Sequence, residues 1–315
     1  MLFTHRRPSR AARLVLAAGL SGAALLTAAA CGSSSGTAAR ADQPMAGMSH
    51  PGGHPAASAA PHPMSSGMGG MGDMATGDGL SATGSGLSFA PSTTALPAGQ
   101  PAAFRFQIRA ADGAPVTAFE PDQTKLMHFY LIRSDLTGFQ HVHPTMAADG
   151  TWTANLATAS AGSYRAYASF ITRISGQDVP LVLSRPVTVP GPAAPAMPLP
   201  APSTATTVDG YTLTVAPGTP LMAGMSHPLT ITVSRNGTPV TDLEPYLDTY
   251  AHLTAFHEGD LGFAHLHPTG MVHGNHGGPA LSFEAAPPRS GRWRLFLQFQ
   301  TAGVLHTAAL TLNVS

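Results

Sequence analysis

Two groups of three histidines recur in this chain with the same spacing. In each group one histidine is followed thirteen residues later by a His-x-His-Pro motif, and the groups are His128, His141 and His143, and His252, His265 and His267. Alternate side chains of a β-strand share a face, so the two histidines of each His-x-His motif project the same way. If the preceding histidine lies on the adjacent strand of an antiparallel hairpin, its Cβ atom is about 5 to 7 Å from theirs. Three imidazoles can then bind one metal ion at ~2 Å and leave a position open for water or another ligand.

This metal site requires one strand register, because a slip by one residue turns the first histidine to the opposite face. The alternative is that the imidazoles form hydrogen bonds within the fold or are exposed, which is the usual fate of a lone histidine. The repetition of the same spacing in both groups favours metal binding. The second group is the better candidate, since more imidazole and carboxylate side chains surround it in the sequence.

Methionine forms the second chemical pattern. The heptapeptide Met-Ala-Gly-Met-Ser-His-Pro occurs twice, and its candidate metal ligands are Met45, Met48 and His50, and Met222, Met225 and His227. Thioether and imidazole ligands together suit Cu(I), and to a lesser extent Cu(II), far better than calcium or magnesium. Low-complexity drift in a linker is the alternative. The pattern favours copper, with zinc possible at the histidines.

The N-terminus has the features of an exported protein. Residues 1–30 contain an arginine-rich start, an uncharged run and a small-residue cleavage site, which together predict a signal peptide. Cys31 directly follows Ala-Ala-Ala, which resembles the lipobox of bacterial lipoproteins. The resemblance implies that Cys31 carries the lipid that anchors the chain to the outer face of the cell membrane. A free thiol in a secreted protein is the alternative.

Composition excludes several classes of function. Sixteen basic and sixteen acidic residues cancel, and Lys125 is the only lysine, so no polycationic surface is available to bind nucleic acid. Charged residues make up only 10% of the chain, while 34 glycines and 29 prolines indicate stretches without a packed core. Cys31 is the only cysteine and lies outside any fold, so a blue-copper thiolate centre is disfavoured.

The rest of the chain is organised as two repeats. Pro115–Pro121 aligns with Pro239–Pro245 at a shift of 124 residues, and both histidine groups align at the same shift. Short β-favouring runs between turn residues predict an all-β fold, with two tandem immunoglobulin-like or cupredoxin-like β-sandwiches. The expected parts are a signal peptide (1–30), a disordered Met/His-rich tether (31–83), a first sandwich (84–189), a Pro/Ala-rich linker (190–204) and a second sandwich (205–315).

The Cys31 motif, the Met/His clusters and the sandwich repeats together resemble bacterial extracytoplasmic copper-handling lipoproteins. The resemblance implies a non-enzymatic protein that sequesters copper or exchanges it with a donor or acceptor protein, with no small-molecule substrate. A metalloenzyme that uses an open three-histidine site is a second hypothesis. A surface adhesion or scaffold module with structural histidines is a third.

Overall fold

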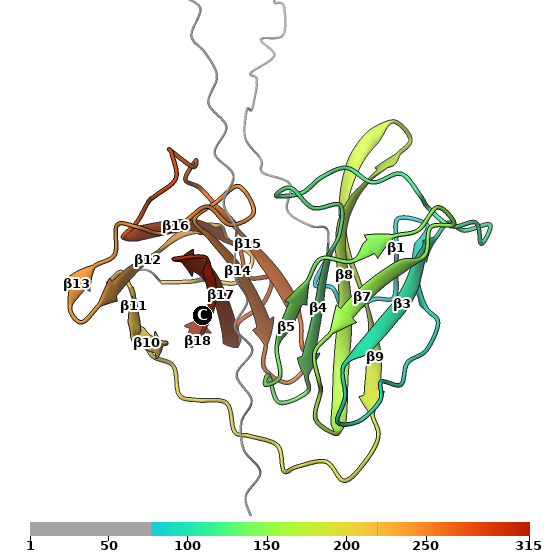
Figure 1. Cartoon of the computed structure of the whole chain (residues 1–315), viewed down its shortest axis with the longest axis horizontal. Coiled ribbons are helices and arrows are strands. Elements are labelled where there is room, and N and C mark those ends of the chain that lie inside the picture. Colours follow the sequence, from blue (N-terminus) through green and yellow to red (C-terminus); the bar gives the residue numbers. More distant parts are fainter. Residues whose placement is uncertain (1–76, 219) are drawn as a thin grey trace, which may run out of the picture. The chain divides into compact units, whose positions relative to one another are not determined.

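The computed structural model describes residues 77–218 and 220–315, which form two β-sandwiches and contain no helix (Figure 1). The prediction of an all-β chain with two tandem sandwich repeats is confirmed. The expected signal peptide, Cys31 and the first heptapeptide, with Met45, Met48 and His50, lie outside the described residues. No helix in the described part of the chain could span a lipid bilayer.

The first sandwich consists of two antiparallel sheets. One sheet has the order β1 (Thr83–Gly84), β2 (Leu87–Pro91), β3 (Ala102–Arg109), β7 (Trp152–Leu156) and β6 (Thr145–Met146). The other has the order β5 (Gln140–Val142), β4 (His128–Arg133), β8 (Gly162–Ile174) and β9 (Gln177–Val189). The two long strands β8 and β9 form a hairpin that is paired along its whole length.

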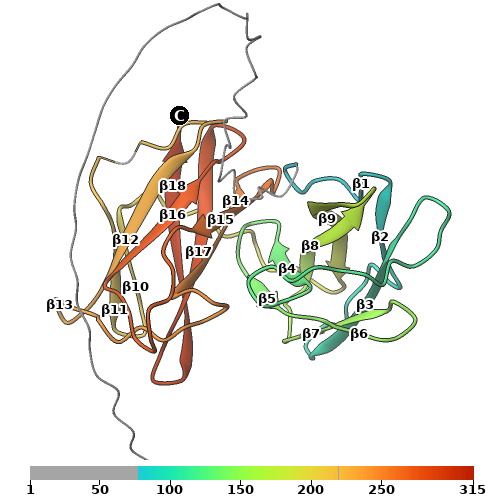
Figure 2. The same ribbon diagram turned by 90° about the horizontal axis from the view of Figure 1, so that it is seen from above.

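The second sandwich repeats this order. Its strands are drawn in yellow to red in Figures 1 and 2. Its first layer is β10 (Ala205–Val208), β11 (Tyr211–Val215), β12 (His227–Arg235) and β16 (Ala280–Ala285), with β13 (Thr238–Pro239) beside β12. Its second layer is β15 (Phe263–Pro268), β14 (Ala251–His257), β17 (Gly291–Thr301) and β18 (Val304–Val314). Strand β15 pairs with both β14 and β16 and so joins the layers.

Each sandwich encloses its own hydrophobic core. In β3 the alternate residues Phe104, Phe106 and Ile108 are buried, which is the period-two pattern of a strand with one face in a core. Burying each such side chain contributes roughly 1.5–3 kcal/mol. The buried indole of Trp293 belongs to the corresponding core of the second sandwich.

A third apolar cluster joins the two repeats. It includes Tyr130 and Tyr167 of the first sandwich and Phe256 and Phe263 of the second. Every residue of β4 is buried, and β14 is buried except at its last residue, because one face of each strand lines its own core and the other face lies in this joining cluster. The joining cluster therefore brings together the two sheets that carry the histidines.

Two connecting segments are also held by hydrogen bonds. In the linker, the Arg133 guanidinium donates to the carbonyl of Ala194 (2.7 Å), and the Met197 amide donates to Asp135 (3.0 Å). Residues 77–83, which the sequence placed in the tether, contact both sandwiches. The amide of Phe263 donates to the carbonyl of Asp78 (2.7 Å).

Candidate metal centre

Strand register fixes where each histidine of the two groups lies. Tyr130 of β4 is paired with His141 of β5, and continuing this register places His128 opposite His143. In the second repeat the same relation places His252 opposite His267, because Thr254 is paired with His265. Paired residues share a face of a sheet, so the three histidines of each group project to the same side.

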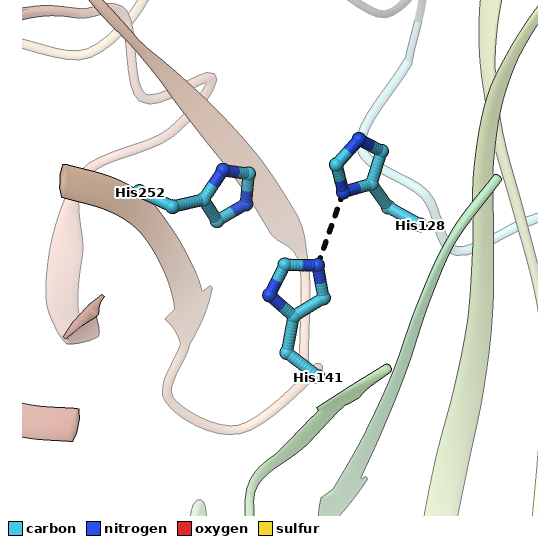
Figure 3. A group of neighbouring side chains, drawn as sticks. All are labelled: His128, His141 and His252. Atoms are coloured by element: carbon cyan, nitrogen blue, oxygen red, sulfur yellow. Dashed lines mark hydrogen bonds between the residues drawn. The ribbon is translucent and has the colours of Figure 1, made fainter. Parts of the chain in front are cut away.

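Three histidines from the two repeats converge on one point. His128 of β4, His141 of β5 and His252 of β14 each offer a ring nitrogen, and these three atoms lie within 4.8 Å of one another. His128 Nδ1 is 3.0 Å from His141 Nε2. Figure 3 shows the three rings pointing toward one another. The centre is therefore shared between the sandwiches, whereas the sequence predicts a separate site for each group.

The remaining nitrogen of each ring faces an oxygen that can only accept a hydrogen bond. His128 Nε2 donates to the backbone carbonyl of Asp122 (3.0 Å). His141 Nδ1 donates to Gln298 Oε1 (2.6 Å), and His252 Nδ1 donates to Gln123 Oε1 (2.8 Å). Metal-binding histidines are characteristically oriented by such a partner on their second nitrogen.

These hydrogen bonds of the outer nitrogens determine which inner nitrogens carry a lone pair. With the outer nitrogens protonated, a neutral His128 and a neutral His141 turn two lone pairs toward each other at 3.0 Å. A cation bound by both lone pairs removes their repulsion. With metal–nitrogen bonds of 2.0–2.1 Å, two nitrogens 3.0 Å apart subtend an angle of about 95° at the ion. The arrangement therefore fits two neighbouring ligands of one metal ion.

Tyr130 is a further polar side chain at the centre. Its hydroxyl donates to His252 Nε2 (3.0 Å), and its ring stacks on His141 with centroids 4.4 Å apart. Burial raises the pKa of Tyr130 well above its usual value, so the phenol is neutral and acts as a hydrogen-bond donor. The phenol therefore competes with a metal ion for the same lone pair.

The imidazoles are held in the form that binds metal. Burial lowers the pKa of His128. Burial, followed by the neighbouring imidazoles, lowers the pKa values of His141 and His252 well below the usual range. Protons therefore compete weakly with a metal ion at neutral pH.

The other three histidines of the two groups extend the cluster. His143 lies beside His141, with ring centroids 4.7 Å apart, and His265 lies at the same distance from His252. His267 is 4.8 Å from His265 by the same measure. The Nε2 atoms of His143 and His265 are buried and have no hydrogen-bond partner among the described residues. All six histidines of the two groups thus form one continuous cluster.

The second heptapeptide lies elsewhere on the second sandwich. His227 of β12 is paired with Ala285 of β16, whereas His267 is paired with the adjacent residue Glu284. Adjacent residues of a strand face opposite sides, so His227 and His267 lie on opposite faces of the layer. Met222 and Met225 belong to the turn that precedes β12, and the side chain of Met225 is exposed.

Sequence reasoning missed the side chains that orient the centre. Gln123 and Gln298 are far from the histidine motifs in the sequence, and glutamine is too common to indicate a site. The signal that was available is the run Phe129–Ile132 of β4. A run without polar alternation indicates burial on both faces, and hence a second packing partner for this histidine-bearing strand.

The fold and the site define a tandem β-sandwich protein with a histidine cluster at the junction of its repeats. A family model described as "Domain of unknown function (DUF8832)" matches residues 82–183 and again residues 206–315. The chain belongs to this family, and each sandwich corresponds to one match. No protein of curated function matches the chain.

Three solved structures with distant similarity illustrate the comparison. The Escherichia coli adhesin FdeC is 17% identical with a TM-score of 0.23, over 73% of this chain and 64% of that one. Yersinia pseudotuberculosis InvD is 13% identical with a TM-score of 0.22, over 74% and 58% of the two chains. A DUF4785 family protein from Legionella pneumophila is 10% identical with a TM-score of 0.25, over 72% and 56%. The chain thus spans less than two thirds of the length of each, and the fold assignment rests on the strand order described above.

Proposed function

We propose that the protein binds copper outside the cytoplasm and sequesters it or passes it to a partner protein. The observation that carries this proposal is the convergence of His128, His141 and His252, each with its outer nitrogen bonded to an oxygen acceptor. A purely structural histidine cluster gains nothing from lone pairs that face each other. A metal ion gives the arrangement a physical reason.

Copper is favoured over other metals by the ligand types. All three donors at the centre are neutral imidazoles, which suit copper, zinc, iron and nickel. The chain also has 13 methionines and a single cysteine, and thioether ligands select copper within that group. Zinc is therefore the competitor against which copper must be measured.

The position of the Met/His-rich segment supports a role in capture. Gly77 and His265 both line a cavity of about 500 Å³. Met74 precedes Gly77 by three residues in the sequence, so the Met/His-rich segment is covalently attached next to a residue that lines this cavity. A ligand-bearing segment attached beside the histidine cluster raises the effective concentration of metal there.

The N-terminal sequence supports the location. The signal-peptide pattern of residues 1–30 and the position of Cys31 favour export followed by attachment to the outer face of the membrane through a lipid. Copper that enters from outside the cell would meet such a protein before it reaches the cytoplasm.

The test is a titration of the full chain with Cu(I), Cu(II) and Zn(II), in which bound metal is measured by elemental analysis after dialysis. A tether-silent variant separates the two classes of ligand. It replaces with leucine or asparagine the residues Met45, Met48, His50, His54, His62, Met64, Met68, Met71 and Met74. In this background we expect tight copper binding that is lost in His128→Asn and His252→Asn.

A matched control is His273→Asn, because His273 is exposed and lies outside the cluster. Copper binding that survives both cluster substitutions would refute the proposed centre. Copper binding that disappears with the tether substitutions alone would assign the function to the Met/His-rich tether. A chain that binds neither metal would favour the surface-module hypothesis, and tighter binding of zinc than of copper would reject copper as the metal.

A further inference from the structure

We infer that a second metal site lies beside the centre, formed by the Asp122 carboxylate with His265 and His267, and that it takes a borderline divalent cation such as Cu(II) or Zn(II). We call it the outer site. It rests on the proposed metal-binding function and adds a second ion to it. Imidazole and carboxylate together are a ligand set used for divalent zinc and copper.

The first observation is a cavity. A hollow of about 280 Å³ is lined by Asp122, Gln123, His265 and His267, together with residues of β8. Gln123 also accepts the hydrogen bond from His252, so the cavity and the three-histidine centre share a wall. Only Gln123 would then separate an ion in this cavity from the three-histidine centre.

The second observation is the state of His265. Its side chain is only 2% exposed, and its Nε2 atom is buried without a hydrogen-bond partner among the described residues. Its Nδ1 atom is 4.0 Å from Asp122 Oδ2, which is too long for a hydrogen bond. The orphaned nitrogen is Nε2, whereas Nδ1 is the nitrogen that faces Asp122 and remains available to a ligand.

A metal ion between His265 and Asp122 accounts for that distance. Ligand atoms at 2.0–2.2 Å from one ion can be up to about 4.2 Å apart when they lie on opposite sides of it. The 4.0 Å separation fits two ligand atoms on nearly opposite sides of a shared ion, which would bind the buried imidazole through Nδ1.

Asp122 begins a tight turn whose backbone occurs in both repeats. Asp122 and Lys125 exchange backbone hydrogen bonds around Gln123 and Thr124, both of which have positive φ (42° and 70°). The second repeat keeps this tight turn, with positive φ at the equivalent positions Leu247 and Asp248.

The side chains of the two turns differ in chemistry. At a shift of 124 residues, Tyr246 takes the place of Asp122 and Leu247 takes the place of Gln123. The strained turn is therefore a feature of the fold, whereas its metal-ligand side chains are a feature of the first repeat only. The outer site consequently occurs on one side of the centre.

The experiment measures metal stoichiometry in the tether-silent full chain with Cu(II) and, separately, Zn(II). Asp122→Asn is the informative variant, because it retains the backbone carbonyl that accepts from His128 and removes only the carboxylate charge. We expect the parent to bind two ions, and we expect this variant to bind the weaker ion about tenfold less tightly or lose it. His267→Asn should have the same effect. Asp242→Asn, at an exposed carboxylate outside the cluster, should have none.

Three outcomes separate this inference from the proposed function. A second ion that Asp122→Asn and His267→Asn leave unchanged overturns the outer site. A single bound ion that is sensitive to His252→Asn but not to Asp122→Asn also overturns it, while the three-histidine centre stands. A chain that binds no ion at all overturns both. Circular dichroism of each variant establishes that a loss of metal is not a loss of fold.

Discussion

Acidification should destabilise the metal-free protein through the histidine cluster. Burial, followed by His128 and Lys125, lowers the pKa of His143 from 6.5 to about 3 in the folded protein. In the unfolded chain the imidazole has its ordinary pKa of 6.5. Between these two values the unfolded chain binds a proton that the folded protein does not. Stability is therefore complete above about pH 6.5 and falls as the pH drops toward 3.

The size of the loss follows from the two pKa values. At pH 5 the difference between the folded and unfolded pKa values of His143 lowers the free energy of unfolding by about 2 kcal/mol. Because His143 is only half-buried, solvent screening reduces this figure, and we expect about 1–2 kcal/mol. Burial also lowers the pKa values of four other histidines of the cluster, His128, His141, His252 and His265. Protonation of each of these groups opposes folding in the same direction as protonation of His143.

The assay is urea unfolding of chelator-treated protein at several pH values between 7.5 and 5. Fluorescence of the buried Trp152 and Trp293 reports on both sandwiches. His143→Asn should reduce the dependence of the unfolding free energy on pH by up to about 1.4 kcal/mol per unit. His273→Asn controls for the removal of a histidine from the unfolded chain. A stability that stays flat between pH 7.5 and 5 would show that the cluster is hydrated or already protonated, and would refute the reasoning.

Further substitutions test the packing and hydrogen bonding around the centre. Gln298→Leu should weaken metal binding about 10- to 100-fold and destabilise the metal-free protein by about 1–3 kcal/mol, since His141 Nδ1–H loses its acceptor; metal titration and urea unfolding check this. Tyr130→Phe should lower the free energy of unfolding of the metal-free protein by about 1 kcal/mol. It should also tighten metal binding up to about tenfold, because the hydroxyl that competes for His252 is lost. Weaker binding would contradict that competition. Phe296→Ala should lower the free energy of unfolding by about 3–5 kcal/mol and so lower the melting temperature, because Phe296 stacks on Phe139 across the repeats with ring centroids 4.2 Å apart. An unchanged melting temperature would mean that the two sandwiches do not depend on this contact.

Much of the architecture follows from local patterns in the sequence. Alternation such as that of Phe104, Phe106 and Ile108 is imposed by a sheet with one face in a core, and it predicted the β-sandwich class. The duplication is visible because residues 115–121 and 239–245 still match after divergence. The thirteen-residue spacing of the histidines also indicated that each group lies on a hairpin with its rings on one side.

The composition of the centre did not follow from the sequence, for a physical reason. It depends on the packing of the outer faces of two sheets, and that packing is set by dispersed residues such as Phe139, Phe256 and Phe296. No local periodicity in the sequence indicates which face of one sheet packs against which face of the other. The acceptors at Gln123 and Gln298 reach the centre only after this packing has formed, so their role is invisible in a linear pattern.

Because the two repeats share the candidate centre, metal occupancy and the cohesion of the repeats would form a single equilibrium. An ion bound by His252 on one side and by His128 and His141 on the other would hold the two sandwiches together. It would strengthen the junction by the same free energy with which the junction strengthens its binding. A partner protein that separates the two sandwiches could therefore release the ion without competing with the imidazoles for it. Conversely, loading with metal would protect the chain from every process that starts by separating its halves.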